Sequence, residues 1–364
     1  MEAIQTHTLT FPENSGFEKT DIFFYSGSPD LRSLYFNGNE TDAPMRLFVT
    51  DETIAQLSAF DSFTQDFHDG KDFLTVLPAG ERFKDITHVL DIVRVALEHN
   101  FDRGCLFIAI GGGVICDMTG FAASMFKRGV SVEFVPTTLL AMVDASVGGK
   151  TGCDFDGYKN MIGAFYPAKA LHVWPSFVQS LPEHEYRSGL AEAVKTAFLF
   201  LPETAQLFLQ NEKLINQRDS KTLQTVITSC VQAKASVVHK DLREKGDRAF
   251  LNLGHTFGHA LETVAGLGKI THGEAVAWGM ARAADLSYAL GLCSKDYVQN
   301  AKEILRMYGY DTEPKPLLAH DILNAMKKDK KNKAEGALRV IIQKDFAENE
   351  IRDVTEQEVM QVLK

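Results

Sequence analysis

The sequence predicts an α/β fold in which a Rossmann-like domain built on a parallel sheet precedes an α-helical domain. Two short apolar runs, RLFVT (46–50) and CLFIAI (105–110), are bounded by polar residues or glycine, as buried parallel strands are. The stretch between them, residues 85–100, places apolar side chains at helical spacing on one face: Ile86, Val89, Leu90, Val93 and Leu97. Strand, helix and strand in series form a βαβ unit, whose strands are parallel.

The pattern changes from strands to helices near the middle of the chain. Before that point, SVEFVPTTLL (131–140) indicates a further strand that ends at its proline. Beyond it, long helical patterns dominate, and one of them, residues 273–291, is stopped by Gly291. We therefore predict two domains, residues 1–180 and residues 181–364.

Composition and charge exclude several classes of protein. With 38 Lys and Arg against 48 Asp and Glu, the net charge is −10, which argues against a nucleic-acid or anionic-membrane partner but allows a few focused lysines to hold an anionic substrate. The five cysteines are scattered without a CxxC pair, which argues against a zinc ribbon or a disulfide framework and for a reducing compartment. Neither a signal peptide nor an apolar run of about 20 residues is found, so we expect a soluble, cytoplasmic protein.

Three glycines follow the second predicted strand in IAIGGGVICD (108–117) and precede an apolar helical run. Glycine allows the backbone to approach a pyrophosphate, and the N-terminus of the next helix offers N–H groups to the anion. The segment is not GxGxxG, and a tight strand-to-helix corner is the alternative. Asp51, after the first predicted strand, could meet a ribose hydroxyl, which favours a nucleotide site. Glu81 and Lys84 lie just before a helix and, taken singly, fit a solvated helix start better.

A second glycine-rich segment, PTTLLAMVDASVGGKTG (136–152), places Lys150 behind a glycine pair. A cationic head in that position suits a phosphate or a dinucleotide. The four-residue spacer of a P-loop is absent, which argues against an ATPase. Lys159 and Asn160 follow in a short polar window. Each residue alone would fit a surface loop, but their clustering around glycine turns favours a binding site.

The second half of the chain offers metal ligands. Glu192 and Lys195 share one face of a predicted helix whose other residues are apolar or small, where a charged pair is costly unless a ligand compensates it. His255 and His259 share a helix face, and His272 opens the next helix. One glutamate and two histidines form a typical catalytic zinc set, so three histidines compete for two places. The residue after the first histidine is not glutamate, which argues against an HExxH protease.

Polar side chains also cluster just before His255 in the sequence. Arg248 and Asn252 lie four residues apart, one turn before it, and Lys234 and Glu244 lie upstream. Together with the two lysines already named, these groups could hold a carboxylate, a phosphate and several hydroxyls.

Seven segments in order resemble the sugar phosphate cyclases, and in particular the 3-dehydroquinate synthase family, over roughly residues 45–364. They are GGGVICDMTGF, RGVSVEFVPTTLLAMVDASVGGKTG, KNMIGAFY, SGLAEAVK, LNLGHTFGHALE, HGEAVAWGM and MKKDKK. Seven collinear motifs are far more specific than one glycine loop. Two departures touch cofactor or substrate loops without removing a catalytic group: Cys116 stands where glycine is usual, and CDFDGY (153–158) differs from the more common asparagine-containing loop.

The resemblance implies a role for each matching position. It implies a zinc or cobalt ion on Glu192, His255 and His272. It implies a catalytic group in which His259 is the acid/base or hydrogen-bonding histidine and Glu244 accepts a proton, completed by Lys150, Arg248 and Asn252. The substrate shell it implies is Arg128, Lys150, Asn160, Lys195, Lys234, Arg248, Asn252 and His259, with Lys330 or Lys331 reaching the site from the C-terminal region. The NAD shell it implies is Asp51, Glu81, Lys84, Gly112, Gly113, Val114, Asp117, Thr137, Thr138, Asp144, Lys150 and Lys159.

The implied reaction converts 3-deoxy-D-arabino-heptulosonate 7-phosphate into 3-dehydroquinate and phosphate, in the shikimate pathway towards chorismate and the aromatic amino acids. Transient oxidation by NAD, phosphate elimination, reduction and intramolecular aldol closure regenerate NAD, so the net reaction is that of a lyase. The resemblance also implies a homodimer.

Three alternatives stay open. A metal-dependent NAD polyol dehydrogenase would consume NAD stoichiometrically and would not need the lysines and Arg248 for an anionic substrate. Another cyclase would act on sedoheptulose 7-phosphate or glucose 6-phosphate. Arg248, Asn252 and His259 favour the dehydroquinate branch, because a carboxylated substrate calls for an additional cation. A non-catalytic NAD-binding regulator would have no reason to keep both a zinc set and a lysine shell.

Overall fold

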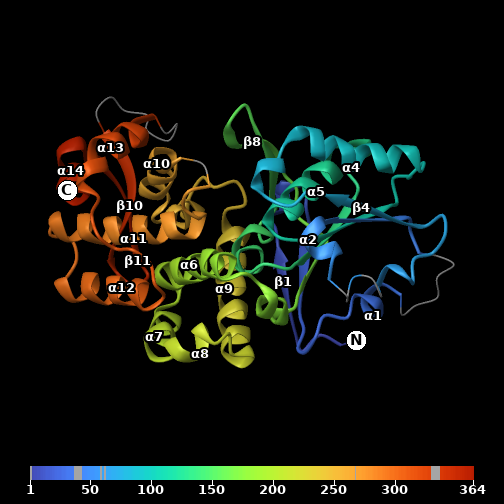
Figure 1. Cartoon of the computed structure of the whole chain (residues 1–364), viewed down its shortest axis with the longest axis horizontal. Helices are drawn as coiled ribbons and strands as arrows, with labels where there is room; N and C mark the ends of the chain where they lie inside the picture. The colour runs from blue at the N-terminus through green and yellow to red at the C-terminus, as the bar shows by residue number, and fades with distance from the viewer. Residues whose placement is uncertain (1, 37–42, 58–59, 61–62, 267, 329–336) are drawn as a thin grey trace. The chain divides into compact units, whose positions relative to one another are not determined.

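The computed structural model describes residues 2–36, 43–57, 60, 63–266, 268–328 and 337–364 (Figure 1). The chain forms two compact units. The first comprises Met1–Leu181 and Lys234–Arg243, and the second comprises Pro182–Ala233 and Glu244–Lys364. In the described part of the chain, no helix is long and apolar enough to cross a membrane.

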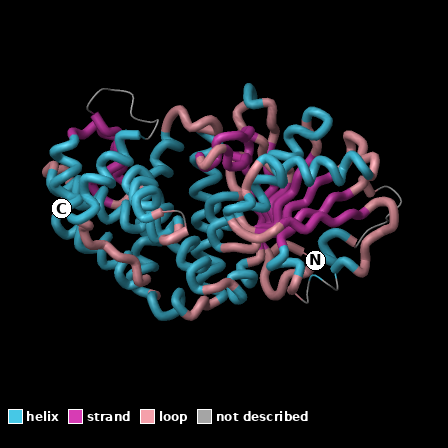
Figure 2. Tube along the Cα trace, turned by 45° about the horizontal axis from the view of Figure 1, so that its top comes forward, coloured by secondary structure: helices cyan, strands magenta, loops and turns pink. Residues whose placement is uncertain are grey.

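A seven-stranded sheet organises the first unit, in the order β1-β2-β9-β6-β5-β3-β4, with its strands side by side in Figure 2. β1 runs antiparallel to β2, and every other neighbouring pair is parallel. The strands are β1 (Gln5–Thr10), β2 (Lys19–Phe24), β3 (Arg46–Asp51), β4 (Asp72–Leu77), β5 (Leu106–Gly111), β6 (Ser131–Pro136) and β9 (Ala170–Val173). The predicted parallel sheet is therefore confirmed, with β3, β5 and β6 at the predicted positions, whereas β1, β2, β4 and β9 were not predicted.

Two helices and an aromatic cluster pack on this sheet. The longer helices of the unit are α4 (Ile86–Glu98) and α5 (Gly113–Met125). Strand residues also contribute to a buried cluster of Tyr25, Leu31, Phe48, Phe60, Phe63, Ile108, Ile110, Val135 and Trp174. The shorter elements are η1 (Glu13–Ser15), α1 (Leu31–Tyr35), α2 (Glu52–Ala55), η3 (Glu81–Phe83), η4 (Phe126–Arg128), the π-helix η5 (Ala141–Ala145), η6 (Pro175–Ser180) and the antiparallel hairpin of β7 (Lys150–Phe155) and β8 (Tyr158–Phe165).

The helix predicted over residues 85–100 is confirmed as α4, but two of the five residues on its predicted buried face are exposed. Its fully buried residues are Val89, Ile92 and Ala96, whereas Leu90 and Leu97 are 46% and 58% exposed. α4 packs on α5, β7 and β4, and its buried residues form the row that begins at Val89. This row is narrower than the apolar stripe in the sequence, so the two leucines fall on the solvent side.

Helices dominate the second unit. They are α6 (Glu183–Phe200), α7 (Pro202–Gln210), α8 (Glu212–Asn216), α9 (Ser220–Lys240, whose last residues belong to the first unit), η7 (Asp247–Asn252), α10 (His255–Ala265), α11 (His272–Ala289), α12 (Lys295–Met307), η8 (Pro316–Leu318), α13 (Ala319–Lys328) and α14 (Glu356–Leu363). The hairpin of β10 (Ala337–Asp345) and β11 (Glu348–Thr355) was not predicted. α11 is the central element, since it packs on α6, α10, α12, α14 and β10.

Candidate metal centre and cofactor cradle

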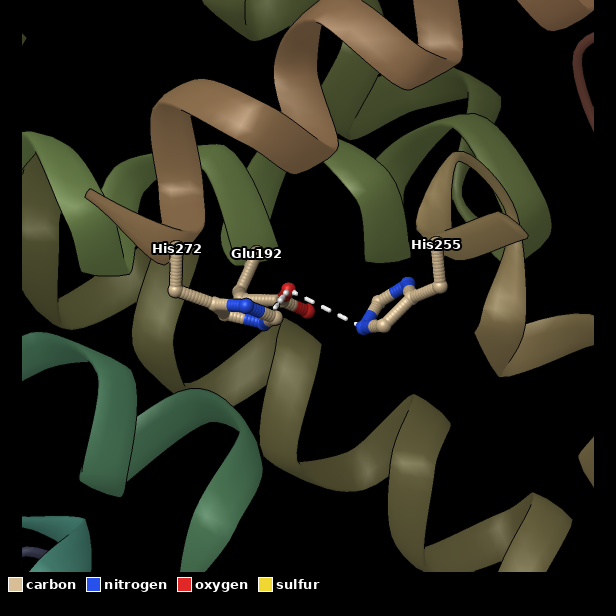
Figure 3. A group of neighbouring side chains, drawn as sticks. All are labelled: Glu192, His255 and His272. Carbon is tan, nitrogen blue, oxygen red and sulfur yellow. Dashed lines mark ion pairs between the residues drawn. The ribbon is translucent and has the colours of Figure 1, made fainter. Parts of the chain in front are cut away.

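Glu192, His255 and His272 lie together in the second unit as the ligands of one metal ion would (Figure 3). Glu192 comes from the middle of α6, and the two histidines are the first residues of α10 and α11. Nε2 of His255 lies 3.7 Å from Oε1 of Glu192, and Nε2 of His272 lies 3.4 Å from the same oxygen. One carboxylate and two imidazoles that converge in this way fit a catalytic zinc or cobalt site.

Glycines at the helix crossings bring these ligands together. A Cβ on Gly273 would lie 2.4 Å from the carbonyl oxygen of Ser188 on α6. A Cβ on Gly279 would lie 2.0 Å from the carbonyl oxygen of Gly254, the residue before α10. Because no side chain fits at either crossing, α11 packs backbone to backbone against both neighbours, and His272 is carried to Glu192.

The centre is buried and strongly charged. Glu192 and Lys195 are each 1% exposed and form an ion pair on α6. Burial, together with the charges of Lys195 and His272, lowers the pKa of His255 well below its usual value. Burial also disfavours charge on His272, but the neighbouring carboxylates of Glu192 and Glu262 outweigh it and raise the pKa of His272 to about 9. A divalent cation would balance the buried carboxylate and displace the proton of His272.

His259 lies beside the centre and is exposed, with its ring centroid 5.2 Å from that of His255 and 5.9 Å from that of His272. A second group that could hold a metal, consisting of His259, Glu262 and His272, shares one histidine with the first. Glu262 was not among the residues predicted from the sequence. Its position seven residues after His255, on the same face of α10, is the signal that could have found it.

Other residues of the predicted catalytic group lie around η7 in the second unit. Asn252 donates a hydrogen bond to the carboxylate of Glu244. Glu244 has a left-handed backbone with φ of 56°. The Arg248 side chain is only 1% exposed. The structure thus brings Glu244 and Asn252 into contact and buries the guanidinium between these two positions in the sequence. Lys330 and Lys331 lie outside the described residues.

In the first unit, the glycine segment forms a turn at the carboxyl ends of β5 and β6. Gly112 precedes α5 without a side-chain cap on that helix. A Cβ on Gly112 would lie 3.1 Å from Thr138, and one on Gly113 would lie 3.1 Å from Ala145. The amide of Thr137 donates to Gly111. A close-packed turn before a 13-residue helix fits a pyrophosphate.

Lys84 joins three segments of the first unit. Its Nζ donates to Oδ2 of Asp117 at 2.6 Å and to Oδ1 of Asn160 at 2.7 Å, and the residue is 5% exposed. Burial opposes its charge, but Asp117 and Glu81 outweigh burial and raise its pKa. A solvated helix start is therefore the wrong interpretation for Lys84, whereas the exposed Glu81 fits it. Asp51 accepts from the amides of Thr53 and Ile54, so it caps α2.

Asp144 lies in the π-helix η5 and is held by Lys234. Nζ of Lys234 lies 2.6 Å from both the carbonyl oxygen and Oδ1 of Asp144, and the lysine is 6% exposed. The π-turn itself is closed by Ser146, whose amide and hydroxyl both donate to Ala141. The remaining predicted residues of this unit are partly or fully exposed: Val114, Arg128, Lys150 and Lys159.

Comparison with known proteins places both halves of the chain in one family. The family model described as 3-dehydroquinate synthase N-terminal matches residues 74–188, and the one described as 3-dehydroquinate synthase C-terminal matches residues 189–332. The chain is 42% identical over 294 residues to the 3-dehydroquinate synthase of Microcystis aeruginosa, which covers 80% of each chain. It is 39% identical over 320 residues to the chloroplastic 3-dehydroquinate synthase of Solanum lycopersicum, which covers 87% of this chain and 71% of the relative.

A solved structure shows the same fold. The 2-epi-5-epi-valiolone synthase of Streptomyces hygroscopicus subsp. jinggangensis superposes with a TM-score of 0.82 at 27% identity, over 94% of this chain and 95% of that chain. That structure contains NAD⁺ and Zn²⁺. The predicted α/β fold with a helical second half is therefore confirmed.

Proposed function

The chain belongs to the 3-dehydroquinate synthase family, and we propose that it converts 3-deoxy-D-arabino-heptulosonate 7-phosphate into 3-dehydroquinate and phosphate. The observation that carries this proposal in the molecule is the convergence of Glu192, His255 and His272. The reaction is a phosphate elimination and ring closure of the shikimate pathway, and it leaves NAD unchanged overall.

The residues present fit both implied cofactors. Zinc or cobalt would be held by Glu192, His255 and His272, and NAD by the glycine turn before α5 with Lys84, Asp117 and Asp144 nearby. When bound, NAD takes up and returns a hydride, and the metal polarises the oxygen on the carbon that is oxidised.

The chain's own side chains bind and orient an anionic substrate. Lys195 and Arg248 are buried cations in the second unit, where a guanidinium can hold a carboxylate or a phosphate with two hydrogen bonds. Asn252 donates a hydrogen bond to Glu244, which orients the Asn252 amide. We propose that the Glu244 carboxylate accepts a proton from the substrate. His259, exposed beside the metal ligands, is available to exchange a proton with the substrate. Arg128, Lys150, Asn160 and Lys234 are the substrate-binding residues we propose from the first unit.

The test is a phosphate-release assay on three sugar phosphates in parallel: the heptulosonate, sedoheptulose 7-phosphate and glucose 6-phosphate. We expect release from the heptulosonate alone, dependent on a divalent metal and on catalytic NAD, with no net NADH. Stoichiometric NADH would instead identify a polyol dehydrogenase. Phosphate release from sedoheptulose 7-phosphate or glucose 6-phosphate, with no release from the heptulosonate, would identify a different cyclase.

Replacing Lys84 with methionine is expected to weaken NAD binding at least tenfold and to destabilise the first unit by about 3 kcal/mol, because the mostly buried Asp117 loses its cation. Isothermal titration with NAD and urea denaturation measure the two effects. In a matched double variant, Lys84→Met with Asp117→Leu, stability should return while NAD affinity stays low. NAD affinity equal to that of the parent in Lys84→Met would show that Lys84 has only a structural role.

We also propose a reducing, cytoplasmic location and a homodimer. All five cysteines are free thiols, four of them buried, which supports a reducing compartment. The dimer rests on the family resemblance.

A further inference from the structure

The two histidines of the candidate metal centre are oriented in the same way. Each presents Nε2 to Oε1 of Glu192. On the other side of the ring, Nδ1 of His255 lies 3.2 Å from the carbonyl oxygen of Leu253. Nδ1 of His272 lies 3.7 Å from Oε2 of Glu262. Each imidazole therefore has an acceptor on the nitrogen that faces away from the centre.

We propose that Glu262 is a positioning residue, which accepts a hydrogen bond from Nδ1–H of His272 and thereby presents Nε2 to the metal. The inference rests on the metal site of the proposed function. An imidazole binds a metal through one nitrogen only when its proton sits on the other, and a carboxylate on that proton fixes the tautomer and makes the ring a better ligand. The distance of 3.7 Å is longer than a hydrogen bond, and such contacts shorten when the site is loaded.

The position of Glu262 suits this task. Its side chain is 14% exposed, so solvent screens it little. It lies on α10, seven residues after His255, while its partner opens α11. One helix thus carries both a metal ligand and the carboxylate that orients the ligand of the next helix.

Direct coordination by Glu262 is the competing role, since His259, Glu262 and His272 also form a possible metal group. Glu192 and Glu262, however, face opposite nitrogens of His272. A single ion on Nε2 is held with Glu192 and leaves Nδ1 to Glu262. Glu192 is buried and lies with two histidines, whereas Glu262 belongs to a group that includes the exposed His259. We therefore assign the metal to Glu192 and the hydrogen bond from Nδ1–H of His272 to Glu262.

The test measures metal affinity in the absence of NAD and substrate, by titrating the metal-free protein with Zn²⁺ against a chromogenic chelator. Glu262→Ala should bind Zn²⁺ roughly 10- to 100-fold more weakly than the parent. Glu262→Gln should lose less, because an amide oxygen can still accept a hydrogen bond from Nδ1–H. With Co²⁺, both variants should keep the parent's visible absorption bands, because the ligand set is unchanged.

Two variants control the experiment. Glu274→Gln removes a nearby charge whose carboxylate binds Thr271 at the start of α11, and it should stay within twofold of the parent. His259→Ala should also keep its metal affinity. Equal losses in His259→Ala and Glu262→Ala would make Glu262 a ligand and overturn the proposal, as would parent-like affinity in Glu262→Ala. If the variants bind Zn²⁺ as expected but the parent protein releases no phosphate from the heptulosonate, the proposed function is refuted and the role of Glu262 stands.

Discussion

Replacing His272 with alanine is expected to remove the bound metal and to lower phosphate release by roughly 10³-fold, which corresponds to about 4 kcal/mol of transition-state stabilisation. The side chain is one of the three that form the Glu192 group among the residues that the structure describes, and its Nε2 lies 3.4 Å from the carboxylate of Glu192. Two remaining ligands hold a divalent ion far more weakly than three. Metal content by plasma emission spectrometry and the phosphate-release assay measure the two losses on one preparation.

Two further histidine variants make the result specific. His184→Ala removes an imidazole that is 64% exposed on α6, and it should change neither metal content nor turnover. His259→Ala should keep the metal and lower turnover, which separates a substrate-contacting histidine from a ligand. An active His272→Ala protein with its full metal content would refute the ligand assignment.

Local patterns in the sequence predicted the helices but not which of their residues meet. The i, i+4 spacing of His255 and His259 places both on one face of α10, and it left three histidines competing for two places. The selection depends on where α11 crosses α6 and α10, which is a long-range property. The buried face of α4 was partly misassigned for the same reason, because its partners, α5, β7 and β4, decide which apolar row is covered.

In the first unit, too, local sequence patterns did not predict which residues come into contact. The segment around Lys84, AGERFK, is typical of a solvent-exposed helix start. The hydrogen-bond partners of Lys84 in the structure are Asp117 and Asn160, which lie 33 and 76 residues further along the chain. The glycine turn, by contrast, was predictable from its neighbours, because a strand, three glycines and a helix specify a local corner. The strands β1 and β2 lie in the N-terminal segment, which precedes the seven motifs of the family resemblance.

Gly273 and Gly279 allow α11 to cross α6 and α10 closely enough to bring the three ligands together. Adding one methyl group at such a crossing tests this role. Gly279→Ala would place a Cβ 2.0 Å from the carbonyl oxygen of Gly254, which is backbone and cannot rotate away. The start of α10 must therefore separate from α11, and His255 moves with it. We expect a destabilisation of about 3 kcal/mol, at the upper end for overpacking, together with at least tenfold weaker Zn²⁺ binding.

Gly291→Ala is the matched control for this variant, because it adds the same methyl group just after α11. Gly291 has φ of 69° and nothing within 4 Å of an added Cβ, so only backbone strain of about 1 kcal/mol is expected, with unchanged metal affinity. Urea denaturation and the chelator titration report the two quantities for both proteins. If Gly279→Ala lost stability but bound Zn²⁺ like Gly291→Ala, the crossing would hold the helices together without setting the metal geometry. Weakened binding in the first variant alone would mean that the close approach of two backbones is what makes three distant side chains into one site.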